Sequence, residues 1–437
     1  MKKNFKIVEL KNGAILLYKK RKWVKATGVK IGFRSGGLRD EIDGTAHFLE
    51  HCFFLKTSKK SKEQICDELS RTCAVCAGTS LFYTCVDFER SNRLLEKSLE
   101  FSAELLLDND INQESMDKEK GVIEEELRLK IEDFKRNLRF YDSIIIDKYS
   151  FDYPKVLGTY ENILNMRAEN LQKYKDKNYV TGNFIASVCS KRPLWYIKKL
   201  INKYFINNMK QEIVNNEKLE NGCFNPSKMQ VVKVDGKDNV ECKITLKLKS
   251  GYLTEKVDYN SEIIRATLAS HKGILGSKLR EKGLIYSFSI NQALMSTTGL
   301  FYFIFKTSKE KLMEIIKVIG EVLHDVCELG ISKEKIDVYK ENAIYHEDEA
   351  YNSRYNVDIA SDMFYNYIDC LQNRNVYKFN FLLKQIAKCN TETTKMEARE
   401  IFNFNNDLYI TIMGNIIEEE VPNFDVVREI LLGQNKY

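Results

Sequence analysis

Residues Gly44–His51 have the sequence GTAHFLEH, and this stretch is the most informative of the chain. His47 and His51 stand four positions apart with Glu50 between them, an H-x-x-E-H pattern that uses two of the five histidines. Residues four apart share one face of a helix, so both imidazoles can reach one ion. Zinc binds neutral imidazole nitrogen, and Glu50, slightly further round the helix, could contact a water rather than the metal. The alternative is a helix N-terminus with two incidental histidines.

A third ligand must come from elsewhere, because a catalytic zinc site uses three protein ligands and leaves one position open. The best source is the acidic segment Glu119–Glu126 (EKGVIEEE). We expect Val122 and Ile123 to mark the buried stripe of a helix, which places Glu119 and Glu126 on the inward face and the other two acids outside. An inward carboxylate needs a partner, and a metal is one. The alternative partner is an internal salt bridge.

The chain also resembles itself over a nearly constant interval of 217 to 224 positions. Such self-similarity indicates a duplicated architecture. Three pairs of segments match. The first pair has helical periodicity, the second pair stands at the beginning of charged helices, and the third pair reads as short apolar strands. The matching pairs are Ser91–Asp108 with Ser308–Asp325, Ile111–Lys118 with Ile331–Val338, and Asn183–Ser187 with Asp407–Thr411.

The duplication predicts two homologous domains, residues 1–218 and 219–437. Strands come first and helices later in each repeat, which favours an α+β fold: a mainly antiparallel sheet with helices packed on one face. The segment Asn215–Lys228 has the Asn, Gly and Pro content of a linker. Lys11–Gly13 (KNG), between two apolar runs, predicts a hairpin turn.

The composition argues against some classes of function and location. The 437 residues carry 68 Lys and Arg against 62 Asp and Glu, a net charge of only +6, and the two signs are interleaved, so we expect no nucleic-acid partner. No run of eighteen apolar residues is present, so we expect no membrane span. The 11 cysteines and the lack of an apolar leader or an Arg-rich transit segment favour free thiols in the cytoplasm rather than in an organelle matrix.

Together these residues resemble the pitrilysin/insulinase superfamily of zinc metallopeptidases, the inverzincins, and especially its processing-peptidase branch of two-domain subunits. The family pattern is G-x-A-H-F-L-E-H, followed seventy-odd residues later by E-K-x-x-V-x-x-E. Here 74 residues separate His51 from Glu126. Leu157–Ile163 (LGTYENI) is similar to the family's L-G-T-x-E-x-I, so the resemblance covers nearly the whole chain.

The resemblance implies roles for the residues of the first domain. His47, His51 and Glu126 would bind Zn²⁺. Glu50 would be the general base of a metal-assisted peptide hydrolysis. Glu119 would match a second acidic position that supports the site from beside the ligand.

The second domain carries another segment of the family pattern. Leu279–Ser287 (LREKGLIYS) is similar to L-R-E-K-x-G-L-x-Y-S, but one residue shorter. By resemblance, Arg280 and Tyr286 would hold the peptide near the scissile carbonyl, and Tyr286 would stabilise the oxyanion, with Arg280 a second candidate for that task.

The segment Cys73–Phe88 alternates as a strand and resembles the family's edge strand N-A-x-T-S-x-x-x-T. In the family this edge pairs with extended substrate, which gives affinity with little demand on sequence. Cys76 occupies the Asn position here, while Ala77, Gly78 and Thr79 keep their backbone groups. The alternative is a plain sheet edge.

The resemblance implies a zinc endopeptidase that cleaves peptides or unfolded segments, bound as an extended strand in a chamber between domains or subunits. Larger members carry four such domains, so this chain would pair with a second copy or with a homologous subunit. The second repeat has no histidine pair, which predicts one zinc site per chain. The alternatives are a non-catalytic peptide-binding subunit of a heterodimeric processing peptidase and a structural assembly protein with a vestigial metal site.

Overall fold

The chain forms two compact units, each assembled from three segments of the sequence. Unit 1 consists of Met1–Glu132, Ser150–Glu217 and Ala350–Leu371, and unit 2 of Asp133–Tyr149, Lys218–Glu349 and Gln372–Tyr437. This computed structural model describes residues 5–71, 75–135, 138, 141, 145, 155–214, 224–249, 259–269, 273–285, 287–294, 299–353, 355–373, 385–404 and 407–433.

Unit 1 is built on a six-stranded sheet, sheet 1, with the order β1-β2-β6-β3-β5-β4. Its strands are β1 (Lys6–Glu9), β2 (Ile15–Lys20), β3 (Ala26–Phe33), β4 (Cys76–Thr79), β5 (Thr84–Ser91) and β6 (Phe184–Ser190). Its helices from the first half of the chain are α1 (Thr45–Cys52), α2 (Lys62–Arg71), α3 (Leu95–Leu107), α4 (Gln113–Lys135, its last residues in unit 2), α5 (Tyr160–Asn165), α6 (Ala168–Asn178) and α7 (Leu194–Tyr204).

Unit 2 is built on a five-stranded sheet with the order β7-β11-β8-β10-β9. Its strands are β7 (Lys228–Lys233), β8 (Val240–Leu248), β9 (Ser287–Leu294), β10 (Gly299–Thr307) and β11 (Leu408–Gly414). Its labelled helices are α8 (Tyr259–Ala269), α9 (Ile274–Glu281), α10 (Leu312–Leu329), α11 (Lys333–Ser353), α14 (Thr391–Ile401) and α15 (Phe424–Leu431), and α11 runs into the segment that joins unit 1.

The two sheets repeat one topology, as the duplication predicts. Each contains a single parallel pair, β2 with β6 and β7 with β11, and every other pairing is antiparallel. The predicted fold class is therefore confirmed. The predicted hairpin is present too, because β1 and β2 pair antiparallel around Asn12, whose φ is 55°. Most of the expected linker, residues 215–223, lies outside the described residues.

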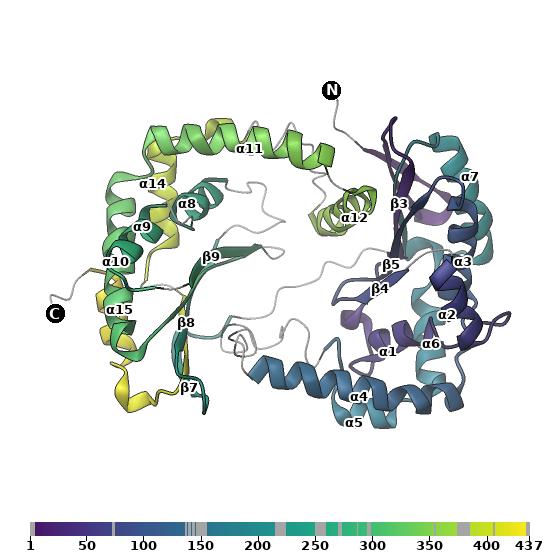
Figure 1. Cartoon of the computed structure of the whole chain (residues 1–437), viewed down its shortest axis with the longest axis horizontal. Coiled ribbons are helices and arrows are strands. Elements are labelled where there is room, and N and C mark those ends of the chain that lie inside the picture. Colours follow the sequence, from purple (N-terminus) through teal and green to yellow (C-terminus); the bar gives the residue numbers. More distant parts are fainter. Residues whose placement is uncertain are drawn as a thin grey trace. The chain divides into compact units, whose positions relative to one another are not determined.

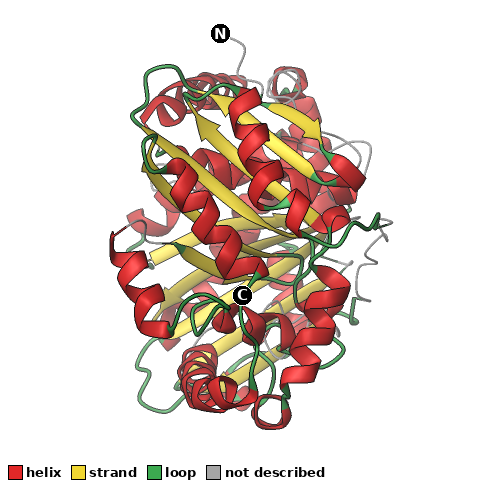
Figure 2. Cartoon of the chain, turned by 90° about the vertical axis from the view of Figure 1, so that its right-hand side faces the viewer, coloured by secondary structure: helices red, strands yellow, loops and turns green. Residues whose placement is uncertain are grey.

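Helices from the first half of the chain cover one face of sheet 1. In Figure 1, α3 and α7 lie on one side of β3, and Figure 2 shows red helices in front of yellow strands. The helix α3 contacts β5, and α7 contacts β2. Apolar residues of β3 alternate along the strand, and Val29, Ile31 and Phe33 are fully buried. This alternation supplies the hydrophobic face on which the helices pack.

The opposite face of sheet 1 is contacted by α12 (Asn356–Asn373), a helix from the second half of the chain. Ile359 and Phe364 of α12 are buried in one cluster with Leu17 and Ile185 of the sheet. Figure 1 shows α12 on the side of β3 away from α3 and α7. The place of α12 was not predicted, because a hydrophobic period indicates the apolar face of a helix but not the surface that this face covers.

The start of α12 lies directly on Gly28 of β3. A Cβ atom at position 28 would lie 2.0 Å from the backbone of Asn356 and Val357, so only glycine allows this approach. Two further contacts fix the helix end: the Val357 amide donates to Glu89 Oε2 at 2.8 Å, and Arg21 Nη1 donates to Asn356 Oδ1 at 2.9 Å.

Among the described residues, no helix combines the length and the apolar character that crossing a membrane requires.

We predict that Gly28→Ala destabilises the protein by about 3 kcal/mol, because the added methyl must displace the backbone of α12. The matched control is Gly121→Ala in α4, where an added Cβ meets nothing within 4 Å and helix propensity rises by about 1 kcal/mol. Urea unfolding of both variants measures the effect. Equal stabilities of Gly28→Ala and the wild type would contradict the close approach of α12 to the sheet.

Candidate metal centre

The helix α1 begins at a fixed point because of two residues before it. Gly44 has a φ of +89°, and a Cβ there would lie 2.9 Å from Gly158, so glycine is required. The carboxylate of Asp40 accepts hydrogen bonds from the amides of Gly44 and Ala46 at 3.0 and 3.1 Å. This carboxylate gives the Ala46 amide, which lies in the first turn, the partner that the helix itself does not supply. The rotation of α1, and with it the direction of its side chains, is thereby set.

The two histidines of α1 lie side by side, as their spacing predicts. Their ring centroids are 4.8 Å apart with an interplanar angle of 75°. His47 is buried and His51 is mostly buried. Both rings therefore sit in an environment where an unpaired polar nitrogen is costly.

The helix α4 brings Glu126 to this pair. Glu126 Oε2 lies 3.3 Å from His51 Nε2 and 3.8 Å from His47 Nε2. One ligand atom from each of the three side chains lies within 4.8 Å of the others. Two imidazoles and one carboxylate are a donor set that zinc uses in catalytic sites.

Glu119, on the same helix, contacts the other side of His51. His51 Nδ1 donates to Glu119 Oε1 at 3.0 Å, and Lys62 Nζ lies 3.5 Å from Glu119 Oε2. A carboxylate on the second ring nitrogen fixes the orientation of a histidine and directs its other nitrogen away. Here that other nitrogen, Nε2, faces Glu126.

The acids and imidazoles shift one another's protonation. Burial lowers the pKa of His51, but its hydrogen bonds with Glu119 and Glu126 outweigh burial and raise it to about 9. The hydrogen bond from His51 lowers the pKa of Glu126 to about 2. Burial, together with the charge of His51, lowers the pKa of His47 to about 4. In the metal-free protein His47 is thus neutral and His51 carries a proton near pH 7.

His47 is the member of the cluster that the protein leaves without a partner. Its Nδ1 is buried and has no hydrogen-bond partner within the described part of the chain. Its Nε2 is too far from Glu126 Oε2, at 3.8 Å, for a hydrogen bond. A cation between His47, His51 and Glu126 would satisfy Nε2, so the three residues fit a metal better than they fit an ion pair.

Glu50 lies on α1 beside the three candidate ligands, and it is linked to the sheet. Thr79 Oγ1 donates a hydrogen bond to Glu50 Oε2 at 2.7 Å. Burial raises the pKa of Glu50, and the bond from Thr79 acts in the opposite direction.

The predicted edge strand is present as β4, which ends sheet 1 and pairs with β5 alone. Cys76 is exposed, and an added Cβ at Gly78 would meet nothing within 4 Å. The described part of the segment Cys73–Phe88, from Val75 onward, forms two antiparallel strands rather than one. The break comes at Ser80, whose hydroxyl accepts hydrogen bonds from the amides of Phe82 and Tyr83 and so supports a turn.

One detail of the predicted α4 stripe is wrong. Val122 is 52% exposed, and the buried positions are Met116, Ile123 and Leu127. Their spacing of seven and four positions is that of one helical face. Glu119 is buried and falls on this face, as predicted. Of the two apolar residues used for that prediction, only Ile123 is buried.

The expected contacts from the second domain are only partly described. Tyr286 lies outside the described residues. Arg280 is exposed in the last turn of α9, in unit 2. Its proposed contact with substrate stays a prediction.

Sequence reasoning missed Lys62, which lies 3.5 Å from Glu119 Oε2, and two further residues near the centre. Lys130 Nζ lies 3.2 Å from Glu126 Oε1, and Asp40 caps α1. The contact of Lys130 could have been predicted, because a lysine four positions after a glutamate lies beside it on a helix. An aspartate four positions before a glycine at a helix start was a readable signal for the cap by Asp40.

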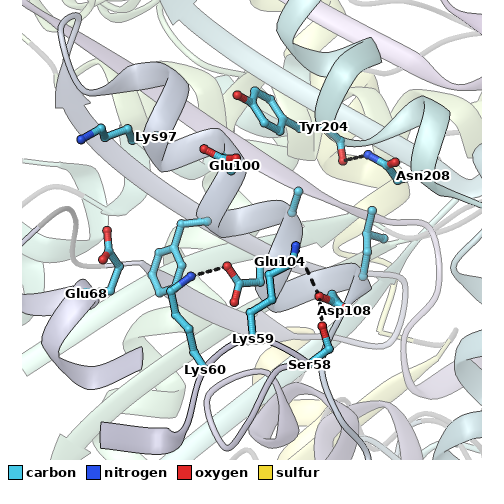
Figure 3. Close-up of a pocket in the computed structure, with 13 residues that line it drawn as sticks. Ser58, Lys59, Lys60, Glu68, Lys97, Glu100, Glu104, Asp108, Tyr204 and Asn208 are labelled. Atoms are coloured by element: carbon cyan, nitrogen blue, oxygen red, sulfur yellow. Dashed lines mark hydrogen bonds and ion pairs between the residues drawn. The ribbon is translucent and has the colours of Figure 1, made fainter. Parts of the chain in front are cut away.

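A surface groove of about 770 Å³ lies elsewhere in unit 1, lined by none of the candidate site residues (Figure 3). Lys60 pairs with Glu104 and Lys59 with Asp108, and Ser58 donates to Asp108. Because these charged groups already pair with one another, the groove gives no sign of a ligand.

Two family models match the chain. The model of the insulinase family, peptidase family M16, matches residues 17–138, and that of the peptidase M16 inactive domain matches residues 165–343. The uncharacterized zinc protease YmxG of Bacillus subtilis is 25% identical over 324 residues, which cover 72% of this chain and 76% of that protein. The mitochondrial-processing peptidase subunit beta of Neurospora crassa is 26% identical over 204 residues, covering 45% of this chain and 42% of that protein.

Solved structures share the fold over nearly the whole chain. A protease from Helicobacter pylori has a TM-score of 0.76 at 19% identity and covers 95% of this chain and 100% of its own. The periplasmic protease PqqL from Escherichia coli has a TM-score of 0.80 at 13% identity and covers 99% of this chain but 50% of its own. The two sheets and their helices thus recur in proteins of distant sequence.

We predict that the metal-free protein loses stability as the pH rises from about 6.5 to about 9. His51 holds its proton more tightly when folded, with a pKa of about 9, than at its ordinary value of 6.5. Its contribution is fully present below pH 6.5 and disappears as the pH passes 9. Urea unfolding in the presence of a chelator measures this slope.

The control for the slope is His324→Gln, which removes a histidine of α10 in unit 2 and should leave the slope unchanged. His51→Gln should flatten it. A wild-type stability that stays constant between pH 6.5 and 9 would show that His51 is not the proton-binding member of the cluster.

Proposed function

We propose that this chain, which belongs to the pitrilysin/insulinase (M16) family of peptidases, is a zinc-dependent endopeptidase that cleaves peptides or unfolded segments bound in extended form. The observation that carries the proposal is the convergence of His47, His51 and Glu126 beside a fourth side chain, Glu50. The relatives named zinc proteases support the choice of metal.

Zinc held by His47, His51 and Glu126 would polarise a peptide carbonyl and lower the pKa of an attacking water towards about 7. Glu50 would take the proton from that water and return one to the leaving amine. Glu119 would keep His51 Nε2 directed at the centre through its bond to Nδ1, as it does in the metal-free protein.

The substrate would pair with the free edge of β4 through the backbone of Ala77, Gly78 and Thr79. The sheet ends at β4, so its outer N–H and C=O groups are available for a further strand. Backbone pairing makes little demand on sequence, and no described feature selects one peptide. Arg280 and Tyr286 would add contacts from the second domain.

We also propose that the chain acts as a dimer, with a second copy or with a homologous subunit. This is supported by the match to PqqL, in which the chain corresponds to half of a longer protease. It is supported as well by the relatives named as beta subunits of a processing peptidase.

Glu50→Gln should keep one zinc per chain and abolish turnover, because general acid–base catalysis contributes about 10²- to 10⁴-fold. Elemental analysis for zinc and digestion of a fluorogenic peptide library measure the two effects. If this variant cleaves peptides at the wild-type rate, Glu50 is not the base.

Glu126→Gln should weaken zinc binding by about 100-fold or more, since it removes one of three ligands. The matched control is Glu125→Gln, one position away on α4, where the carboxylate is exposed and pairs with Arg128 at 2.6 Å. Competition with a chromophoric chelator measures both affinities. An equal loss in the two variants would point to a general effect of negative charge rather than to ligation.

A peptide-library digest of the chain alone, with and without a chelator, separates the enzyme from its alternatives. Chelator-sensitive cleavage supports the proposal. Cleavage that appears only after a homologous subunit is added supports a heterodimer. Zinc binding and peptide binding with no cleavage under either condition would leave a non-catalytic peptide-binding subunit and overturn the proposal.

A further inference from the structure

The hydrogen bond between Thr79 and Glu50 joins the edge strand to the helix that carries the histidines. Thr79 is the last residue of β4, and Glu50 lies in α1. The hydroxyl is the donor, so it must bind a carboxylate oxygen of Glu50, and the distance of 2.7 Å is typical of a charge-assisted bond. Residues 29 positions apart are thus locked together in the centre itself.

The strand geometry explains why this contact is possible. Side chains of a strand alternate between its faces, so Ala77 and Thr79 point to one face and Gly78 to the other. Thr79 pairs with Thr84 of β5, which is fully buried. The helix α1 contacts both β4 and β5. The hydroxyl of Thr79 therefore faces α1, whereas substrate would approach along the free backbone edge of the same residue.

The carboxylate of Glu50 accepts no other hydrogen bond within the part of the chain that the structure describes. Its side chain has several rotatable bonds, and it stands next to His51 on α1. Without the bond from Thr79 the carboxylate is free to turn toward His51 and the ligand cluster. With the bond, one oxygen is held on the sheet side and the other is left free.

We propose that Thr79 is a positioning residue whose hydroxyl holds Glu50 Oε2 and thereby directs Glu50 Oε1 at the reacting water. The proposal rests on the endopeptidase function above. Because the backbone of Thr79 also belongs to the substrate-binding edge, one residue fixes the position of the base relative to the bound peptide strand. Substrate register and base orientation are then set together.

Thr79→Val tests the proposal, because valine keeps the shape and the strand preference of threonine and removes only the hydroxyl. We expect kcat for a fluorogenic peptide to fall about 10- to 100-fold, the effect of one hydrogen bond to a charged group, with KM unchanged. Thr79→Ser, which keeps the hydroxyl, should restore kcat. A Thr79→Val enzyme with wild-type kcat, or a Thr79→Ser enzyme as slow as Thr79→Val, overturns the proposal.

The matched control is Thr84→Val, directly across the strand pair. Thr84 Oγ1 donates to the Ser35 carbonyl at 3.0 Å, so this variant also loses a hydroxyl from the β4–β5 hairpin but leaves Glu50 untouched. Its kcat should stay at the wild-type value. If Thr84→Val is as slow as Thr79→Val, the loss reflects a weakened hairpin and the proposal is wrong.

A measurement without turnover separates this proposal from the function on which it rests. The visible absorption of the Co²⁺-loaded protein reports the surroundings of the ion. Thr79→Val should change this spectrum, because Glu50 is released beside the ion, and the change should vanish in the Glu50→Gln background. If the wild type cleaves no peptide but this pattern holds, the function fails and the positioning role stands. If Thr79→Val leaves the spectrum unchanged, the positioning role fails.

Discussion

The site depends on the approach of Glu126 to two imidazoles that lie 75 and 79 positions earlier in the chain. Asp40 and Gly44 set where α1 begins, and burial of Ile123 and Leu127 sets how α4 is rotated. Each residue of a helix turns it by about 100°, so a shift of one position in α4 would carry the carboxylate out of reach. Apolar packing and the start of α1 therefore determine where the three candidate ligands meet.

The charges around His51 alternate outward from its ring. Glu119 and Glu126 contact its two nitrogens, and Lys62 and Lys130 contact those acids in turn. This arrangement alone would also describe an internal salt bridge, the alternative that the sequence left open. His47 favours the metal that we propose, because neither of its nitrogens forms a hydrogen bond within the described chain. A proton on His51 satisfies the network around that ring, whereas the proposed cation would supply the partner that Nε2 of His47 lacks.

Local sequence patterns predicted the elements and most of the centre, because the relevant periods are short. The spacing of His47 and His51 and the inward position of Glu119 follow from helix geometry. Val122 was misassigned because two adjacent apolar residues cannot both lie at the middle of one stripe, and sequence does not say which is inside. The contact of α12 with Gly28 could not be predicted from the sequence. It joins residues 328 or more positions apart, and a local pattern does not indicate which surface a helix will pack against. The hydrogen bond from Thr79 to Glu50 could not be predicted either, because it depends both on how β4 pairs with β5 and on where α1 begins.

The second unit shows what the fold requires and what it does not. Helix α8 follows β8 as α1 follows β3, and the sheets share one topology, yet α8 contains no histidine and its Glu262 pairs with Arg265. The architecture is thus stable without imidazoles at this place. A buried polar atom without a partner costs about 1–3 kcal/mol, and Nδ1 of His47 is such an atom in α1. Natural proteins tend to violate the rule that buried polar atoms are hydrogen-bonded at functional sites. His47 violates it beside the place where the three candidate ligand atoms meet.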